Sequence, residues 1–82
     1  MSLEDMHMIE RHIRLNETKD VHEFVAEAVK CDFDIDISCS RIIIDAKSIL
    51  GILSMDLTRV LTVRCYGESQ RFNKVMEKFA VA

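Results

Sequence analysis

The sequence predicts one small α/β (α+β) domain, an open-faced sandwich in which helices cover one face of a four-stranded, mainly antiparallel sheet. Four short segments alternate apolar with polar residues or are rich in β-branched residues, as half-buried strands are. Two longer segments repeat apolar residues at the spacing of a helix. A chain of 82 residues has room for one core, so we treat residues 1–82 as a single domain.

The first strand and the first helix are expected in the first third of the chain. Residues 9–15 alternate with the period of two of a strand. Its inward residues are Ile9, Ile13 and Leu15. After a polar turn, Asp20 and Glu23 have the spacing of a capping box, so we expect a helix over residues 20–31. The apolar stripe of this helix consists of Val21, Phe24, Val25, Ala28 and Val29.

A hairpin is expected next. Residues 34–39 alternate strictly and predict a strand. Its inward residues are Ile35, Ile37 and Cys39. Residues 42–44 are three isoleucines, whose stiff β-branched side chains favour a strand over a helix. Ser40 and Arg41 connect the two strands as a tight turn, although neither is the glycine that such turns prefer.

The remaining elements are a short helix, a strand and a long helix. Ser48 can N-cap a helix that runs to about residue 54, accepting a hydrogen bond from the amide of Leu50 or Gly51. Residues 61–66 alternate as a strand, and residues 69–80 carry the stripe of the last helix. That stripe consists of Phe72, Val75, Met76 and Phe79. Each long helix has one stripe to bury, so both must cover the same face of the sheet.

Composition excludes several classes of function. The net charge of -3 provides no basic field for nucleic acid, and no apolar run approaches the roughly 20 residues that span a bilayer. The three cysteines, Cys31, Cys39 and Cys65, are an odd number without a Cys-x-x-Cys pair. We interpret them as reduced, buried thiols in a cytoplasmic protein, and we expect no metal site and no cofactor. Residues 1–7 are expected to be disordered or a cloning remnant.

Three acidic residues precede or begin the second strand. Asp32, Asp34 and Asp36 lie at alternating positions. We interpret them as a solvated acidic rim rather than an acid/base pair, since carboxylates are seldom buried without partners.

Two segments carry a resemblance to a known family. Residues 47–54 read Lys-Ser-Ile-Leu-Gly-Ile-Leu-Ser, and residues 24–30 read Phe-Val-Ala-Glu-Ala-Val-Lys. Both resemble HPr, the histidine-containing phosphocarrier of the bacterial phosphoenolpyruvate-dependent sugar phosphotransferase system, whose octet is Lys-Ser-Ile-Met-Gly-Val-Met-Ser. The resemblance implies the HPr-like order β-α-β-β-α-β-α, with a short helix between the two long ones. It also implies a protein that is not an enzyme, and at most a phosphoryl carrier.

The chain departs from the family at its reactive loop. The phosphohistidine of HPr lies in a Gly-Leu-His-Ala-Arg-Pro-Ala motif, but this chain has no proline, and its two glycines are Gly51 and Gly67. The histidine nearest to the corresponding place is His22, on the first turn of the expected helix. His22 is therefore the candidate phosphoryl acceptor of this chain. The alternative is a solvated histidine, because Asp20 and Glu23 would repel a phosphoryl group.

The resemblance also suggests sites around the short helix. Ser48 matches the serine that a dedicated kinase phosphorylates in HPr of many Gram-positive bacteria; the alternative, a plain N-cap, is compatible with that role. The family docks its partners through this region, which points to Lys47, Ile49, Leu50 and Leu53. We expect so short a helix to leave some of its apolar surface exposed to solvent, where a partner can bind. The alternative interpretation is that the helix is fully buried.

Three functional hypotheses follow. The chain is a regulatory interaction module, bound by a phosphotransferase-system protein, a regulator or a kinase through the Ser48 to Leu53 surface. Alternatively, it is a phosphocarrier that uses His22 in an altered loop. The third possibility is an α/β domain of unrelated function.

Overall fold

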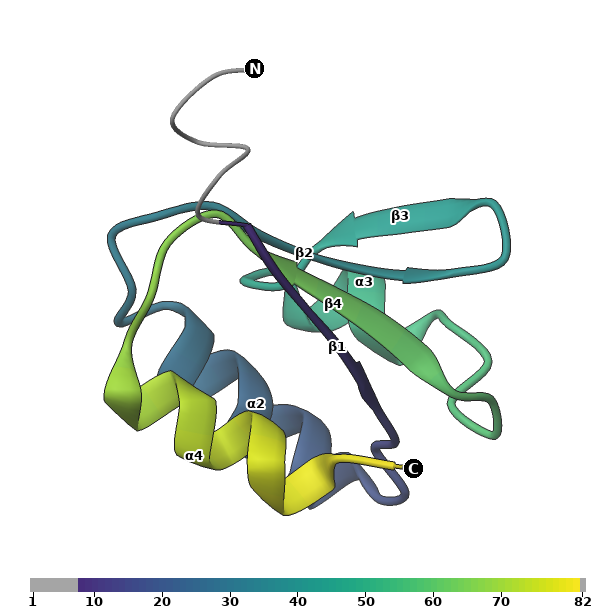
Figure 1. Ribbon diagram of the computed structural model, residues 1–82. Coiled ribbons are helices and arrows are strands. Elements are labelled where there is room, and N and C mark those ends of the chain that lie inside the picture. Colours follow the sequence, from purple (N-terminus) through teal and green to yellow (C-terminus); the bar gives the residue numbers. More distant parts are fainter. Residues whose placement is uncertain (1–7, 82) are drawn as a thin grey trace.

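The computed structural model describes residues 8–81 as a four-stranded antiparallel sheet with three helices, and the expectation for residues 1–7 lies outside this range (Figure 1). The order of elements is the predicted β-α-β-β-α-β-α. The elements are β1 (Ile9–Ile13), α2 (Thr18–Ala28), β2 (Ile35–Cys39), β3 (Ile42–Asp45), α3 (Ile49–Leu53), β4 (Leu61–Cys65) and α4 (Gln70–Phe79). The predicted open-faced sandwich is confirmed.

The strands lie in the order β1-β4-β2-β3, and every neighbouring pair is antiparallel. β4 is therefore a central strand, with Val63 opposite Arg11 of β1 and Ile37 of β2. The hairpin partner β3 lies at the edge (Figure 1). This order places the β2–β3 hairpin and the following α3 at one side of the molecule, away from β1.

The helix α2 begins and ends earlier than predicted. Glu17 is its N-cap, and Asp20 is the third helical residue of a capping box, so the predicted cap at Asp20 with Glu23 is wrong. Leu15, two residues after the end of β1, is completely buried, which leaves only two residues before the helix starts at Thr18. At its other end Val29 is the C-cap and half-exposed, so the prediction that Val29 belongs to the buried stripe is also wrong.

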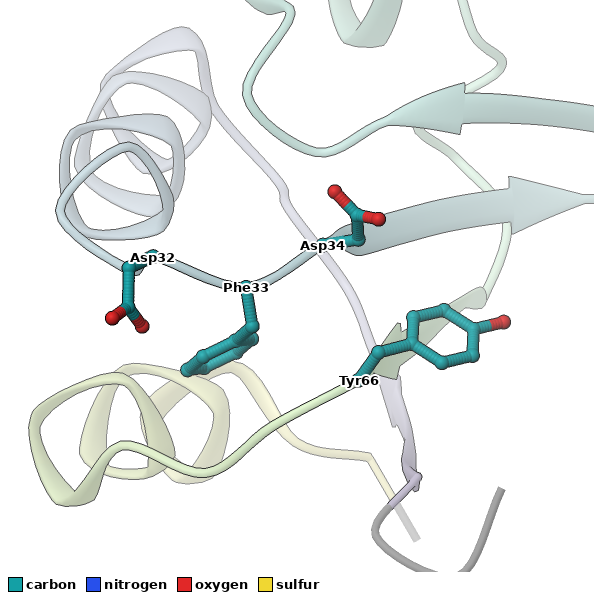
Figure 2. Close-up of a pocket in the computed structure, with 4 residues that line it drawn as sticks. All are labelled: Asp32, Phe33, Asp34 and Tyr66. Atoms are coloured by element: carbon teal, nitrogen blue, oxygen red, sulfur yellow. The ribbon is translucent and has the colours of Figure 1, made fainter. Parts of the chain in front are cut away.

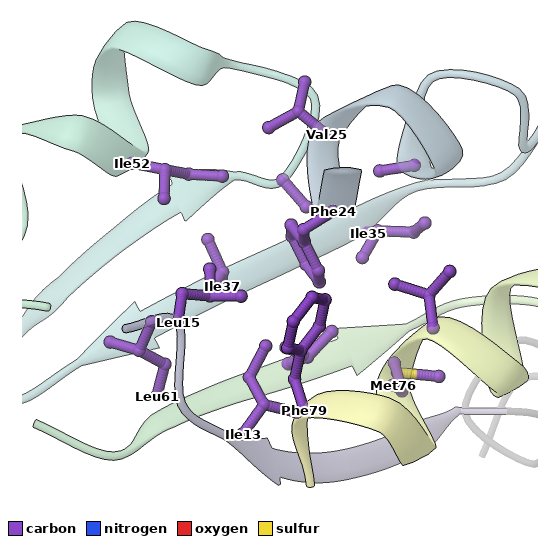
Figure 3. Close-up of a cluster of buried hydrophobic side chains, with 14 of the residues drawn as sticks. Ile13, Leu15, Phe24, Val25, Ile35, Ile37, Ile52, Leu61, Met76 and Phe79 are labelled. Carbon is purple, nitrogen blue, oxygen red and sulfur yellow. The ribbon is translucent and has the colours of Figure 1, made fainter. Parts of the chain in front are cut away.

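The core lies between the sheet and the two long helices. Phe24 from α2 and Phe72 from α4 pack with ring centroids 5.4 Å apart at an angle of 55°. Apolar side chains of the strands surround them, as the labelled Ile13, Ile35 and Ile37 show in Figure 3. All four predicted residues of the α4 stripe are buried. Apart from Val29, the apolar stripes of both long helices therefore belong to this one core cluster.

The hairpin turn between β2 and β3 uses a left-handed backbone without glycine. Ser40 has φ 56°, whereas side chains favour negative values. Its hydroxyl accepts a hydrogen bond from Arg59 Nη1 at 3.1 Å. The tight turn is therefore confirmed, but at a conformational cost that glycine would not carry.

On β1, β2 and β4 the uncovered face of the sheet carries polar side chains, and their contacts change the interpretation of Asp36. Arg64 Nε donates to Glu10 Oε1 at 3.1 Å across β1 and β4. Asp36 lies opposite Arg64 in the β2–β4 register and accepts a hydrogen bond from the hydroxyl of Tyr66 at 3.3 Å. Asp36 is half-buried, and its Oδ1 is fully covered without a hydrogen-bond partner. Asp32 and Asp34 are exposed, so the solvated rim comprises these two residues only.

The cysteines differ in their burial. Cys65 on β4 is buried, with Sγ 3.8 Å from Met76 Sδ, and burial raises the pKa of its thiol to about 12. Cys31 and Cys39 are only half-buried, so the expectation of three buried thiols holds for Cys65 alone. All three are free thiols.

Candidate functional site

The start of α2 is closed by the chain's own carboxylate. Asp20 Oδ2 accepts hydrogen bonds from the amides of Asn16 and Glu17, both at 3.2 Å. Free amides at a helix start are a common binding place for phosphate. Here two of the amides beside that position already face a negative charge, so an incoming phosphoryl group would meet repulsion.

His22 lies further along the helix than predicted. It is the fifth residue of α2, on the second turn instead of the first, because the helix begins at Thr18. Its side chain is exposed to solvent. An imidazole at this place is accessible to a partner, but it projects from the body of the helix and not from the loop ahead of the free amides.

Ser48 caps α3 as predicted. The Oγ of Ser48 accepts a hydrogen bond from the amide of Gly51 at 3.3 Å, and Ser48 is exposed to solvent. At the other end of the helix, Ser54 Oγ donates to the carbonyl of Gly51 at 2.6 Å. Both ends of this short helix are therefore held by serine hydroxyls, and the Ser48 hydroxyl is accessible from solvent.

The four apolar residues of α3 divide between the core and the surface. Ile52 is completely buried, and Ile49 is half-buried against the core. Leu50 is 79% exposed and Leu53 is 38% exposed. The prediction that apolar area of this helix reaches solvent is therefore confirmed. We call the surface formed by Ser48, Ile49, Leu50 and Leu53 the α3 surface.

Gly51 lets α3 lie close to β3. A Cβ built on Gly51 would be 2.7 Å from Cγ2 of Ile44 and 3.0 Å from Oγ of Ser48. Any larger residue would push the helix away from the strand or displace the Ile44 side chain. The glycine therefore fixes the position from which Leu50 is presented.

Lys47 is held by the chain itself. The Nζ of Lys47 donates hydrogen bonds to the carbonyls of Cys31 and Phe33, both at 3.0 Å, and Lys47 is half-buried. These bonds tie the segment after α2 to the start of α3. A partner-binding role for Lys47 stays a prediction, with the ammonium already engaged by two carbonyl groups.

A further hollow, which the sequence did not indicate, lies beside the segment between α2 and β2. It has a volume of about 350 Å³ and is lined by Asp32, Phe33, Asp34 and Tyr66. Figure 2 shows that the carboxylates of Asp32 and Asp34 point to opposite sides of this segment, while the Tyr66 ring points away from Phe33. The lining side chains do not converge on one point, so they do not form a chemical site.

Within residues 8–81, no group of three or more His, Cys, Asp or Glu side chains is placed to hold a metal ion. The helices of this range also lack the combination of length and apolar character that crossing a membrane requires. Among the sites suggested by the sequence, the structure exposes His22 and part of the α3 surface.

Comparison with known proteins identifies the fold. No family model and no curated protein matches the sequence. Among solved structures, the phosphocarrier protein HPr from Bacillus anthracis str. Ames matches with a TM-score of 0.61 and 24% identity, over 89% of this chain and 93% of that one. HPr-C-His from Thermoanaerobacter tengcongensis matches with a TM-score of 0.68 and 22% identity, over 89% of each chain.

The molecule is thus an open-faced α/β sandwich. More narrowly, its fold is HPr-like over most of the chain. Identities of 22% and 24% establish this fold and leave the activity to be argued from the site.

Proposed function

We propose that this chain is a protein-interaction module of the bacterial phosphoenolpyruvate-dependent sugar phosphotransferase system, acting in the cytoplasm and without enzymatic activity. The observation that carries the proposal is the α3 surface of an HPr-like fold, where Leu50 is 79% exposed beside Leu53. An exposed leucine on a helix with capped ends is an apolar contact that needs no rearrangement before a partner binds.

The start of α2 favours regulation over phosphoryl transfer. Asp20 places a carboxylate on two amides beside the helix start, and His22 lies on the second turn. A carrier must stabilise a dianionic phosphoryl group beside its histidine, which requires donors free to face it. The alternative, a carrier that uses His22, is supported by the exposure of that side chain.

Phosphorylation of Ser48 is the proposed switch. The hydroxyl is exposed, lies at the edge of the apolar contact and is held at the helix start by Gly51 N. A phosphate there adds about 1.5 to 2 negative charges next to Leu50 and Leu53. Partners with a basic rim would bind the modified form more tightly, and partners with an acidic rim would bind it less tightly.

Two phosphoryl donors distinguish the hypotheses. Purified protein is incubated with enzyme I and phosphoenolpyruvate, or with HPr kinase and ATP, and the intact mass is measured. We expect one phosphate from ATP, absent from Ser48→Ala, and no phosphate from phosphoenolpyruvate. An acid-labile phosphate on His22 would establish the carrier alternative and refute the regulatory one. If neither donor modifies the chain, the Ser48 switch and the carrier are both excluded.

Binding tests the α3 surface directly. The affinity for HPr kinase is measured by calorimetry for the unmodified chain, for Leu50→Lys and for Val29→Lys. Val29 is 53% exposed at the end of α2 and provides a matched apolar-to-lysine control on a different helix. We expect Leu50→Lys to weaken binding at least about tenfold and Val29→Lys to leave it unchanged. Equal effects of both variants, or no binding by the unmodified chain, would contradict the proposal.

A further inference from the structure

The edge strand β3 has an unusual composition for its position. It is the outermost strand, paired only with β2 among the residues that the structure describes (Figure 1). It reads Ile-Ile-Ile-Asp, and Ile42 and Ile43 are 54% and 66% exposed. Proteins usually protect a free edge with lysine, proline or a bulge, because unpaired backbone groups there attract another strand. β3 contains no lysine and no proline, so its protection is limited to its length of four residues and to Asp45 at its end.

The hydrogen bonds of the hairpin show which groups face the free edge. The amide of Ala46 donates to the carbonyl of Ile35 at 2.9 Å, so residue 46 points its backbone toward β2. In an antiparallel ladder this orientation alternates, so Ile42 and Ile44 also point toward β2. The amides of Ile43 and Asp45 and the carbonyls of Arg41 and Ile43 therefore face outward. The carbonyl of Asp45 already accepts the amide of Ser48 at 2.9 Å.

We propose that β3 pairs with β3 of a second copy of this chain, antiparallel and in register about a two-fold axis at Ile43. In this register, Arg41 of each copy lies opposite Asp45 of the other. Moving the axis to Arg41 or to Asp45 would instead oppose like charges. The outward amides and carbonyls also match: Ile43 bonds with Ile43 of the second copy, and the Asp45 amide donates to the Arg41 carbonyl of the second copy.

The same register covers the exposed isoleucines. Ile43 meets its own counterpart on the uncovered face of the sheet, while Ile42 lies opposite Ile44 of the second copy on the helix side. The seam is only about five residues long, which is well below the area of a standard interface. We therefore expect a weak dimer, with a dissociation constant of roughly tens to hundreds of micromolar. This inference is independent of the function proposed for the α3 surface.

Reversing the charge of Arg41 or of Asp45 tests both that the partner is a second copy of this chain and that the strands pair in the proposed register. Arg41→Glu places like charges at both ends of the seam, and so does Asp45→Lys. Each variant alone is expected to dimerise at least about tenfold more weakly than the natural chain in sedimentation equilibrium. An equimolar mixture of the two variants restores opposite charges at both ends and is expected to dimerise again. If the mixture stays as weak as its components, the proposed register is wrong.

Matched lysine substitutions separate this edge from general surface effects. Ile43→Lys places two lysines at the axis and is expected to abolish dimerisation, whereas Val29→Lys, at a similarly exposed valine, should leave it unchanged. Circular dichroism spectra establish that each variant is folded. A natural chain that stays monomeric at about millimolar concentration would overturn the proposal. A dimer that is unaffected by Ile43→Lys would also overturn it.

Amide hydrogen exchange provides a residue-level test. Raising the protein concentration should slow exchange at Ile43 and Asp45, whose amides become bonded across the seam. Ile42 and Ile44 should exchange at the same rate at every concentration, because their amides already face β2. Protection that does not alternate along β3 would refute strand pairing at this edge.

Discussion

Replacing Leu50 by lysine should scarcely change the stability of the fold, whereas replacing Ile52 by alanine should lower it strongly, although both residues lie on one short helix. Only about a fifth of the Leu50 surface is withdrawn from water, whereas Ile52 is completely buried. Exposed substitutions usually change the free energy of unfolding by less than about 0.5 kcal/mol. Removing the buried side chain of an isoleucine costs about 2 to 5 kcal/mol, because a cavity remains.

These values translate into a clear difference in melting temperature. For a domain of this size, about 1 kcal/mol corresponds to a shift of about 4 to 8 °C. Leu50→Lys should therefore change Tm by less than about 4 °C, and Ile52→Ala should lower it by at least about 8 °C. Far-ultraviolet circular dichroism of dilute samples measures both. If Leu50→Lys lowers Tm as much as Ile52→Ala, Leu50 belongs to the core and the α3 surface is not available to a partner.

Three other predictions concern the caps, the hairpin and the buried thiol. Asp20→Ala should lower the free energy of unfolding by about 0.5 to 2 kcal/mol, measured by urea denaturation, because two amides lose their acceptor; an unchanged midpoint would exclude the capping role. Ser40→Gly should raise Tm by a few °C, since glycine adopts φ 56° without strain, and a fall in Tm would show that the Arg59 contact matters more. For Cys65 the pKa is raised in the folded state from 9.0 to about 12, so its contribution to stability is complete below pH 9 and is lost as pH rises toward 12. The stability of Cys65→Ala should therefore fall less steeply between pH 9 and 12, and parallel curves for the two proteins would contradict the assignment.

The order of elements was predictable because it depends on local patterns. Alternation of side chains and the spacing of apolar stripes are properties of each segment alone. The Ser48 cap was predictable for the same reason, since serine before an apolar run has one favourable role at a helix start. The exposure of apolar area on α3 followed from its length.

Features that depend on distant parts of the chain were not predictable. Asp20 is a good N-cap residue, but the burial of Leu15 sets where the chain turns, and the helix starts earlier. Val29 continues the apolar period, yet the chain must leave the helix there to reach β2. Asp36 meets Arg64 and Tyr66 only through the pairing of β2 with β4.

The exposure of the isoleucines on β3 is a further case. A run of three isoleucines predicts a strand, and a β-branched run also suits a central position. Only the strand order shows that β3 lies at the edge, with Ile43 on its outer, uncovered side. The sequence therefore predicted the hairpin, whereas the exposure of isoleucines at the edge of the sheet is visible only in the structure.

The two bonds from Lys47 Nζ to the carbonyls of Cys31 and Phe33 have a consequence for the physics of association. With this ammonium directed inward, the contact centred on Leu50 carries little positive charge of its own. Long-range attraction should then contribute little to the encounter with a partner, and added salt should scarcely alter the rate of complex formation. Association through this helix would instead be driven by release of water from leucine side chains, with the negative heat-capacity change that accompanies it.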